Sequence, residues 1–433
     1  MQPGIEIYPE SVFDVDLQTG FMPPRVPLAR LPATWRPWES LLESAIQQKL
    51  RPGDIIGLSP QDEARSARWR HQIDTTPVLL TDPLKESPVL LRRAHLVLTF
   101  LLHFYVQTLP PTAPVLIPRP ISIPLLKISK HLDISPVVTF SDTVLYNWDL
   151  KTALAPSDFP PSLDNLRSQT LFSGLPDEEV FYLSSARIEL RGVEALEIMR
   201  MTMDEVFVGD DLAVGRTTKG LKRLAIVIRD LRQLLLDVRK GCDPETYYNE
   251  VRPWFRGEDS DPLKRKWVFE GISEEGLEEP KELSGASAGQ SSLVHALDCF
   301  LGVDSVRATP DGKPSFMSRM QVYMPKNHRL FLDHLAKTSR PLRRFVQESN
   351  NEELLKAFNE AVLALKEFRD AHMIIVTLYI IGPSKRANTL EREKKREERE
   401  KQELKGTGGT DLVKFLKGVR TQTAETVLEP PPN

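Results

Sequence analysis

Residues 366–380 read KEFRDAHMIIVTLYI, a stretch in which one histidine, His372, leads into a strongly apolar run. Ser349 and Glu352 form the S-x-x-E pattern of a capping box, which predicts the start of a long helix upstream of it. Gly382, which is followed by proline, predicts the end of that helix. His372 therefore lies in the last third of the helix, either as a core histidine or as a ligand.

The composition favours a folded protein without a strong electrostatic preference for any partner. The 433 residues are enough for two or three domains, and 57 basic residues nearly balance 60 acidic ones. Only two cysteines, Cys242 and Cys299, are present, which excludes a disulfide framework and a cysteine-rich zinc site. The first ten residues lack signal-peptide features, and the longest apolar runs, 96–106 and 373–382, are about half a membrane span. We expect a cytoplasmic protein that binds neither nucleic acid nor membrane.

Proline divides the chain into two parts. Of 35 prolines, 22 lie in the first 161 residues, and residues 177–243 contain none. Because proline interrupts helix interiors, we expect short elements in the first part and long helices in the second. The sequence APSDFPPSLDN, within residues 155–175, is typical of a linker. We predict a mainly α fold, with a small, mixed but mostly helical N-terminal domain (residues 1–160) and a large all-helical domain (residues 161–433).

Helical spacing of apolar residues predicts several individual helices. Ser287 and Gln290 fit a second capping box, S-x-x-Q. Residues 384–410 are expected to form a mobile loop, since 388–405 are almost entirely charged and KGTGGT follows them. The predicted helices cover residues 88–108, 123–132, 178–205, 221–240, 287–303 and 349–382.

The eight histidines do not form a metal-binding pair at helical spacing. A haem requires only one axial histidine on a helix, so His372 is a candidate haem ligand. Arg369 lies three residues earlier and shares its helix face, where it could neutralise a haem propionate or pair with an acidic residue. An ordinary core histidine beside a structural salt bridge is the alternative interpretation.

Three further stretches have features of binding segments. SGASAGQSS (284–292) contains small residues at a helix start, where backbone N–H groups could approach an anion or another helix could pack. KGTGGT (405–410) lacks the order of a Walker A motif and suggests a loop that closes over a site. DPETYYNEVRPWF (243–255) places four aromatic residues near Arg252, which could hold an aromatic carboxylate or lie on the surface beside core aromatics.

Together, and in this order, these stretches resemble indoleamine 2,3-dioxygenases. The resemblance spans roughly residues 90–420. The pair AGQSS and KGTGGTDL, with a histidine between them, is its most specific part. The matching stretches are ISIPLLKISKHLDISPVVTFSDTVLYNW (121–148), FYLSSARIE (181–189), GISEEGLEEPKELSGASAGQSS (271–292), MPKNHRLFL (324–332), FRDAH (368–372) and KGTGGTDLVKFLK (405–417).

The resemblance implies a b-type haem between a small N-terminal and a large helical domain. His372 would be the proximal iron ligand, and Arg369 would hold the haem edge with Asp298 as its salt-bridge partner. Ser287, Ala288 and Gly289 would form the loop over haem and substrate. The cofactor-binding positions are thus Arg369, Asp298, Ser287, Ala288 and Ser185.

The resemblance also implies the substrate-binding positions. Arg252 would take the substrate carboxylate, and Phe181 and Tyr247 would bracket the indole. Thr407 would belong to the loop that closes on the substrate. The full set is Arg252, Phe181, Tyr247, Phe140, Thr143, Ala286 and Thr407.

Two residues depart from the family pattern that the resemblance implies. Tyr247 stands where phenylalanine is usual, and Ala286 replaces the second glycine of GGSAGQSS. The stretch LFSGLPDEEV (171–180), before Phe181, also differs from the usual version. An added hydroxyl and an added methyl in the pocket could each weaken tryptophan binding.

The activity implied is that of a haem dioxygenase that inserts both atoms of O2 across the indole C2–C3 bond of L-tryptophan. The product would be N-formylkynurenine, in the first step of the kynurenine pathway toward NAD. No side chain is expected to act as a general acid or base, an electron donor would reduce ferric haem, and the chain would be a monomer. The alternative is a haem-binding relative with weak tryptophan activity that acts on another indole or has a non-enzymatic role.

Overall fold

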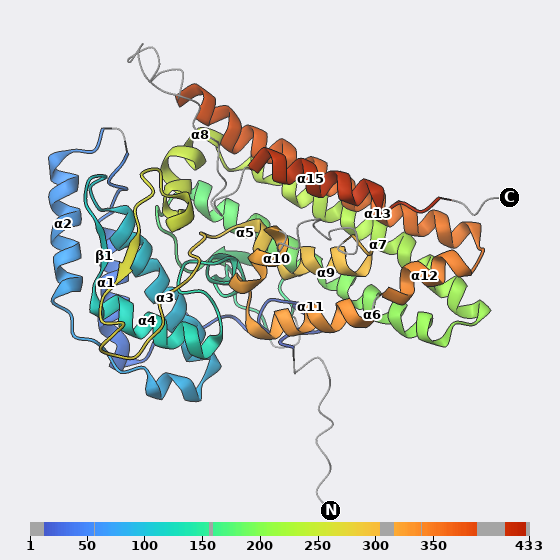
Figure 1. Cartoon of the computed structure of the whole chain (residues 1–433), viewed down its shortest axis with the longest axis horizontal. Helices are drawn as coiled ribbons and strands as arrows, with labels where there is room; N and C mark the ends of the chain where they lie inside the picture. Colours follow the sequence, from blue (N-terminus) through green and yellow to red (C-terminus); the bar gives the residue numbers. More distant parts are fainter. Residues whose placement is uncertain are drawn as a thin grey trace, which may run out of the picture.

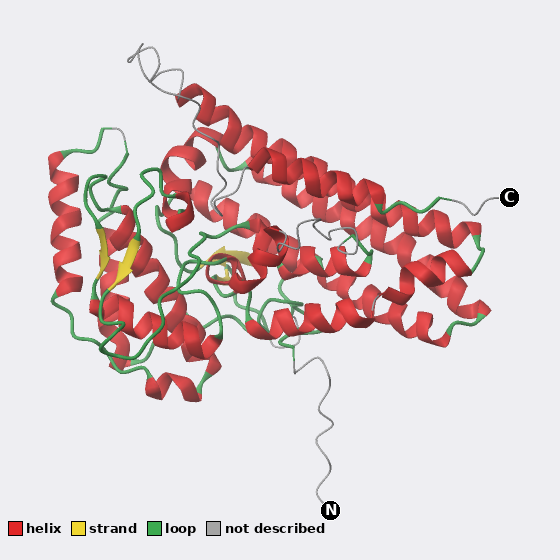
Figure 2. Ribbon diagram, in the orientation of Figure 1, coloured by secondary structure: helices red, strands yellow, loops and turns green. Residues whose placement is uncertain are grey.

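Helices dominate the computed structural model, and short strands tie distant segments together (Figure 2). In the part of the chain that the structure describes, four strands of three residues each form two pairs. β1 (Val115–Ile117) runs parallel to β4 (Trp267–Phe269), and β2 (Trp148–Leu150) runs antiparallel to β3 (Leu166–Ser168). The prediction of a mainly α fold is confirmed, although β3 and β4 add strands to the half expected to be all helical. The described residues are 13–55, 57–155, 159–303, 316–338, 340–387 and 412–429.

The helices fall into a group at one end of the molecule and a longer bundle at the other (Figure 1). The first group comprises α1 (Arg36–Gln47), α2 (Pro60–Asp74), α3 (Pro88–Gln107) and α4 (Arg119–Leu132). The remaining helices are α5 (Pro176–Arg191), α6 (Val193–Val208), α7 (Asp211–Asp237), α8 (Pro244–Thr246), α9 (Ser292–Phe300), α10 (Phe316–Met320), α11 (Lys326–Thr338), α12 (Arg340–Glu348), α13 (Glu352–Val376) and α15 (Leu412–Glu425).

Helix α3 is the core of the first group. It is long and apolar enough to cross a membrane, with a mean hydropathy of 1.4, but 83% of that stretch is buried inside the fold. A helix that is apolar on all sides must be covered on all sides, and α1 and α4 pack against it. Much later segments complete the cover: Phe100 stacks on Phe172 at a centroid distance of 4.0 Å, and the His103 ring donates to the Trp254 carbonyl across 2.7 Å.

The long bundle is centred on α7 and α13, which pack side by side, with α6 against α7 and α15 along α13 (Figure 1). Apolar residues at helical spacing form the contact, and each contributes about 1.5–3 kcal/mol when fully buried. Buried positions are Leu221, Leu224, Ile228 and Leu231 of α7, and Leu354, Phe358, Ala361 and Leu365 of α13.

The predicted helix at 178–205 is in fact two helices, α5 and α6, which meet at Gly192. A Cβ atom on Gly192 would lie 2.2 Å from the Leu293 side chain. The glycine therefore lets α9 approach the bend closely. Sequence periodicity missed the break because a single glycine is tolerated within a helical pattern.

The predicted capping box of Ser287 and Gln290 is wrong. Helix α9 begins after Ser291, whose hydroxyl accepts a hydrogen bond from the Val294 backbone N–H at 3.4 Å. Ser287 instead caps a short 3₁₀ turn. Both Ser287 and Ser291 could have capped the helix by residue type, and the structure shows that Ser291 does so.

The long helix predicted around His372 exists as α13, with different ends. Its cap is Asn351, whose side chain accepts from the Leu354 N–H at 2.9 Å, rather than Ser349. Regular α-helix ends at Val376, but a π-turn follows and the backbone remains helical through residue 387. The predicted stop at Gly382 is therefore wrong, since the helical backbone continues through this glycine and the proline that follows it.

Two other helices begin earlier than predicted. Helix α4 starts at Arg119, and Pro120 occupies its first turn, where proline is compatible with a helix. Helix α7 starts at Asp211, after Asp210 caps it by accepting from the Ala213 N–H at 2.7 Å. The predicted linker APSDFPPSLDN ends in a 3₁₀ turn (Leu163–Asn165), and β3 follows it directly. Both strand pairs join segments from the two sides of the predicted boundary near residue 160, which stays a prediction.

Backbone segments 255–257 and 283–285 lie in direct contact, because both carry glycine at the point of closest approach. A Cβ on Gly285 would lie 1.7 Å from the Phe255 carbonyl oxygen, and one on Gly257 would lie 2.1 Å from the Leu283 carbonyl oxygen. This contact fixes the start of the small-residue stretch 284–292.

The substitution Gly285→Ala is expected to destabilise the protein by more than about 2 kcal/mol, since backbone must shift to admit the methyl group. Gly215→Ala is the matched control, because Gly215 lies in α7 with open space around its Cβ position. The control should be neutral or gain about 0.5–1 kcal/mol from better helix propensity. Urea unfolding followed by circular dichroism measures both, and equal stability of the two variants would contradict this contact.

Candidate active site

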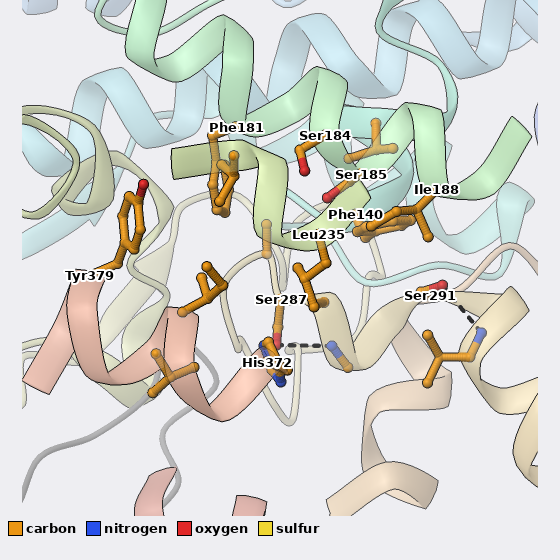
Figure 3. Close-up of a pocket in the computed structure, with 18 of the residues that line it drawn as sticks. Phe140, Phe181, Ser184, Ser185, Ile188, Leu235, Ser287, Ser291, His372 and Tyr379 are labelled. Atoms are coloured by element: carbon orange, nitrogen blue, oxygen red, sulfur yellow. Dashed lines mark hydrogen bonds between the residues drawn. The ribbon is translucent and has the colours of Figure 1, made fainter. Parts of the chain in front are cut away.

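A cavity lies between α5 and α13. Figure 3 shows Phe181 and Ser185 extending from α5 on one side, with His372 on the facing helix α13. The small-residue stretch 284–292 and α15 contribute further lining residues. The sequence-predicted site residues that line this cavity are Phe140, Thr143, Phe181, Ser185, Tyr247, Ala286, Ser287, Ala288, Gly289, Arg369 and His372.

Three predicted site residues have a different placement. Arg252 and Asp298 are not among the lining residues. Asp298 lies behind the wall as the partner of Arg369. Thr407 lies outside the described residues, so its predicted role in a closing loop stays a prediction.

Three π-turns carry lining residues. Ser141–Leu145 contributes Thr143, Tyr247–Val251 begins with the lining Tyr247, and Thr377–Ile381 contributes Tyr379. A π-turn accommodates one extra residue in a helical turn, and such turns are frequent at functional sites. Hydrophobic periodicity could not indicate these turns, because five residues are too few to show a changed period.

His372 has the properties of an available ligand. Its ring faces the cavity, and neither ring nitrogen has a hydrogen-bond partner within the described residues. Burial, reinforced by the positive charge of Arg369, lowers the pKa of His372 to about 4. The imidazole is therefore neutral at physiological pH, which is the form that coordinates a metal.

Arg369 and Asp298 form a buried ion pair that joins α13 to α9. Arg369 is 8% exposed and Asp298 is fully buried. The pairing expected between them is thus present, and it holds a cation at the cavity wall one helical turn from His372. Removing one member of a buried pair leaves an uncompensated charge, which typically costs about 3–5 kcal/mol.

Gln290 fixes the loop that lines the cavity. Its side-chain carbonyl accepts from the Phe140 N–H at 2.8 Å, and its amide donates to the Gly285 carbonyl at 2.9 Å. Within the loop, the Gly289 N–H donates to the Ser287 hydroxyl at 3.2 Å (Figure 3). One buried amide therefore connects the loop to the segment that carries Phe140.

Glu189 is a site residue that the sequence analysis missed. Phe181, Ser185 and Glu189 follow one another on α5 at intervals of four residues. Extending the spacing that grouped Phe181 with Ser185 by one helical turn would therefore have identified Glu189. Its side chain is 2% exposed and accepts from the Ser291 hydroxyl at 2.6 Å. Burial raises the pKa of Glu189 to about 7, although the Ser291 hydrogen bond opposes the rise.

Phe181 and Tyr247 lie side by side in the cavity wall. Their ring centroids are 4.6 Å apart, so the two rings contact each other and form one aromatic wall together with Phe255. The predicted bracketing of an indole by Phe181 and Tyr247 stays a prediction.

Arg252 lies beside the cavity, with its guanidinium 5.4 Å from the centroid of the Tyr248 ring. Burial lowers its pKa below the ordinary arginine value. Its predicted role as the carboxylate anchor stays a prediction.

The lining residues fit a haem group. Among the described residues no cluster of three or more His, Cys, Asp or Glu is placed to hold a metal ion, whereas a haem needs one protein ligand. A neutral imidazole without a partner, a neighbouring cation and a largely apolar wall provide that ligand, a propionate partner and a low-dielectric pocket.

Comparison with known families gives one match over nearly the whole chain. Residues 10–426 match the family described as "Indoleamine 2,3-dioxygenase". Indoleamine 2,3-dioxygenase 1 of Rattus norvegicus is 30% identical over 97% of this chain and 96% of its own length. Indoleamine 2,3-dioxygenase nanC of Aspergillus nanangensis is 31% identical over 96% and 97%. The 6-hydroxytryptophan 2,3-dioxygenase fscD of Fusarium equiseti is 28% identical over the same shares.

Glu189→Gln is expected to change how stability depends on pH. The raised pKa means that the folded chain retains a proton on Glu189 between about pH 4.5 and 7, where the unfolded chain has lost it. The Glu189 contribution to stability therefore falls as pH rises through this window, by at most about 3 kcal/mol. The glutamine variant should lose this fall.

Thermal unfolding of both proteins at several pH values measures the difference. Glu63→Gln is the control, since Glu63 is exposed on α2, and its profile should parallel the wild-type profile. A Glu189→Gln profile that also parallels the wild type would contradict the protonated state.

Proposed function

The chain belongs to the indoleamine 2,3-dioxygenase family, and we propose on this premise that its substrate is L-tryptophan. It is an oxidoreductase, a dioxygenase of the tryptophan and indole kind. The proposed reaction inserts both atoms of O2 across the indole C2–C3 bond and gives N-formylkynurenine. The observation that supports it most is the neutral, cavity-facing His372 on the helix opposite Phe181.

The proposed cofactor is haem b. His372 would coordinate the iron, and Arg369, held by Asp298, would pair with a propionate. When bound, the haem supplies the redox chemistry with O2, and the protein supplies binding and orientation.

The chain's own residues provide an apolar and enclosed site. The wall of Phe181, Tyr247 and Phe255 presents ring faces to an indole. Phe415 and Leu416 of α15 contribute apolar side chains to the cavity lining, which helps to exclude water. The reaction requires no side-chain acid or base, and Glu189 serves to hold α5 against α9 through Ser291.

A different indole is the second candidate substrate. One relative is named for 6-hydroxytryptophan, so members at this level of identity differ in the ring that they accept. In this chain, the Tyr247 hydroxyl and the Ala286 methyl both line the cavity and alter its shape and polarity. A substrate panel distinguishes the two candidates.

The remaining parts of the proposal follow from the family resemblance. They place the enzyme in the cytoplasm as a monomer, with an electron donor that keeps the haem reduced. The reaction would open the kynurenine pathway toward NAD.

The decisive experiment supplies the reduced, haem-loaded protein with L-tryptophan and ¹⁸O2 and measures N-formylkynurenine by mass spectrometry. Two labelled oxygen atoms in the product are expected. His372→Ala should lose the Soret absorbance and the product together, whereas His71→Ala, at an exposed position on α2, should keep both. Product without haem absorbance, or full activity of His372→Ala, would contradict the proposed function.

Arg252→Ala is expected to lower kcat/KM for L-tryptophan, because the guanidinium is proposed to pair with the substrate carboxylate in a dry pocket. The decrease should correspond to a loss of roughly 2–4 kcal/mol in transition-state stabilisation. Arg252→Lys keeps the charge and should lose less. Steady-state kinetics measures both variants. Unchanged kcat/KM in Arg252→Ala would remove Arg252 from the substrate site.

A further inference from the structure

The hydroxyl of Tyr247 is a polar group in the cavity wall that the fold itself does not use. Tyr247 is 5% exposed and lines the cavity, and its hydroxyl has no hydrogen-bond partner within the residues that the structure describes. Two other buried tyrosines, Tyr379 and Tyr323, differ in this respect, whereas the Tyr182 hydroxyl also lacks a partner within the described residues. Tyr379 donates to the Cys242 carbonyl at 2.6 Å, and Tyr323 accepts from the Ser284 N–H at 2.9 Å.

The Tyr247 ring is held on several sides. Phe181 lies at a centroid distance of 4.6 Å and Tyr379 at 5.7 Å. Its backbone is fixed as well, because its N–H donates to the Asp243 carbonyl and its carbonyl accepts from the Arg252 N–H in the π-turn. These contacts hold the ring in the cavity wall, where the described fold provides no hydrogen-bond acceptor for the hydroxyl and a bound ligand could provide one.

The surroundings of this hydroxyl favour an anionic acceptor. Burial raises the pKa of Tyr247 above the ordinary tyrosine value, so the hydroxyl keeps its proton, and the Arg252 guanidinium opposes that rise more than any other charge does. Arg252 is therefore a cation close enough to act on the hydroxyl, although it is not itself a lining residue. In L-tryptophan the indole N–H and the ammonium group donate, and the strong acceptors are the carboxylate oxygens.

We propose that the Tyr247 hydroxyl donates a hydrogen bond to the carboxylate of the indole substrate and makes the site select indole carboxylates over indole amines. Arg252, the proposed partner of the same carboxylate, contributes a positive charge, and the Tyr247 hydroxyl contributes an additional hydrogen bond. Tyr247 is thus a specificity-determining residue of this chain. The inference rests on the proposed function only in that the ligand is an indole.

The test compares two ligands that share the indole ring and differ in the charged end of the side chain. Isothermal titration calorimetry on the haem-loaded protein measures the Kd of indole-3-propionate, which carries a carboxylate, and of tryptamine, which carries an ammonium group. The wild type should bind indole-3-propionate more tightly. Tyr247→Phe should weaken indole-3-propionate about tenfold and change tryptamine less than about twofold, the loss expected for one charge-assisted hydrogen bond.

Tyr248→Phe is the matched control. Tyr248 is the next residue, is not a lining residue, and presents its ring to Arg252 in a way that phenylalanine preserves. This variant should keep the wild-type preference for the carboxylate. Thermal unfolding should show Tyr247→Phe to be as stable as the wild type, because no hydrogen bond within the described fold is lost.

Three results would overturn the inference. One is a Tyr247→Phe protein that loses affinity equally for both ligands or for neither. Another is a wild type that does not prefer indole-3-propionate. The third is a Tyr247→Phe protein that loses affinity for 6-hydroxyindole but not for indole-3-propionate, which would assign the hydroxyl to a ring substituent. Absence of N-formylkynurenine from the wild type would instead refute the proposed activity and leave this binding comparison intact.

Discussion

The buried ion pair between Arg369 and Asp298 is the interaction on which the site depends. It connects α13, which presents His372, to α9, which begins at the end of the small-residue loop. Because both groups are desolvated, neither can leave the pair without exposing a charge to a low-dielectric interior. The position of the ligand helix relative to the loop is therefore fixed by electrostatics as well as by the apolar packing of α7 on α13.

A second polar contact joins α9 to α5, on the opposite side of the cavity from α13. Glu189 of α5 accepts from Ser291, the residue that caps α9. Helix α9 is thus attached to α5 above the cavity and to α13 below it. Burial shifts the pKa values of two cavity groups in opposite directions, since it raises that of the Glu189 carboxyl and lowers that of the His372 imidazole. Near neutral pH the cavity thus combines a neutral imidazole, a partly protonated carboxyl and a paired arginine.

Local signals in the sequence predicted much of the fold and part of the site. The periodicity before His372 predicted α13, but Ser349 and Asn351 are both good caps and only packing selected Asn351. The i+4 spacing grouped Phe181 with Ser185, and the cavity shows both. The partner of Arg369 lies 71 residues away, so only the family resemblance could indicate it. The contact of Phe181 with Tyr247, and the position of Arg252 beside the cavity, depend on a π-turn whose extra residue leaves no trace in the periodicity.

The largely apolar helix α3 has a consequence for synthesis of the chain on the ribosome. Its cover includes Trp254, whose carbonyl accepts from His103, 151 residues earlier. At about 5–20 residues per second, roughly 10–30 s pass between the two. During that time the nascent chain exposes a segment with the length and hydropathy of a membrane anchor. The burial of residues 88–107 is therefore completed only after the segment around Trp254 has been synthesised.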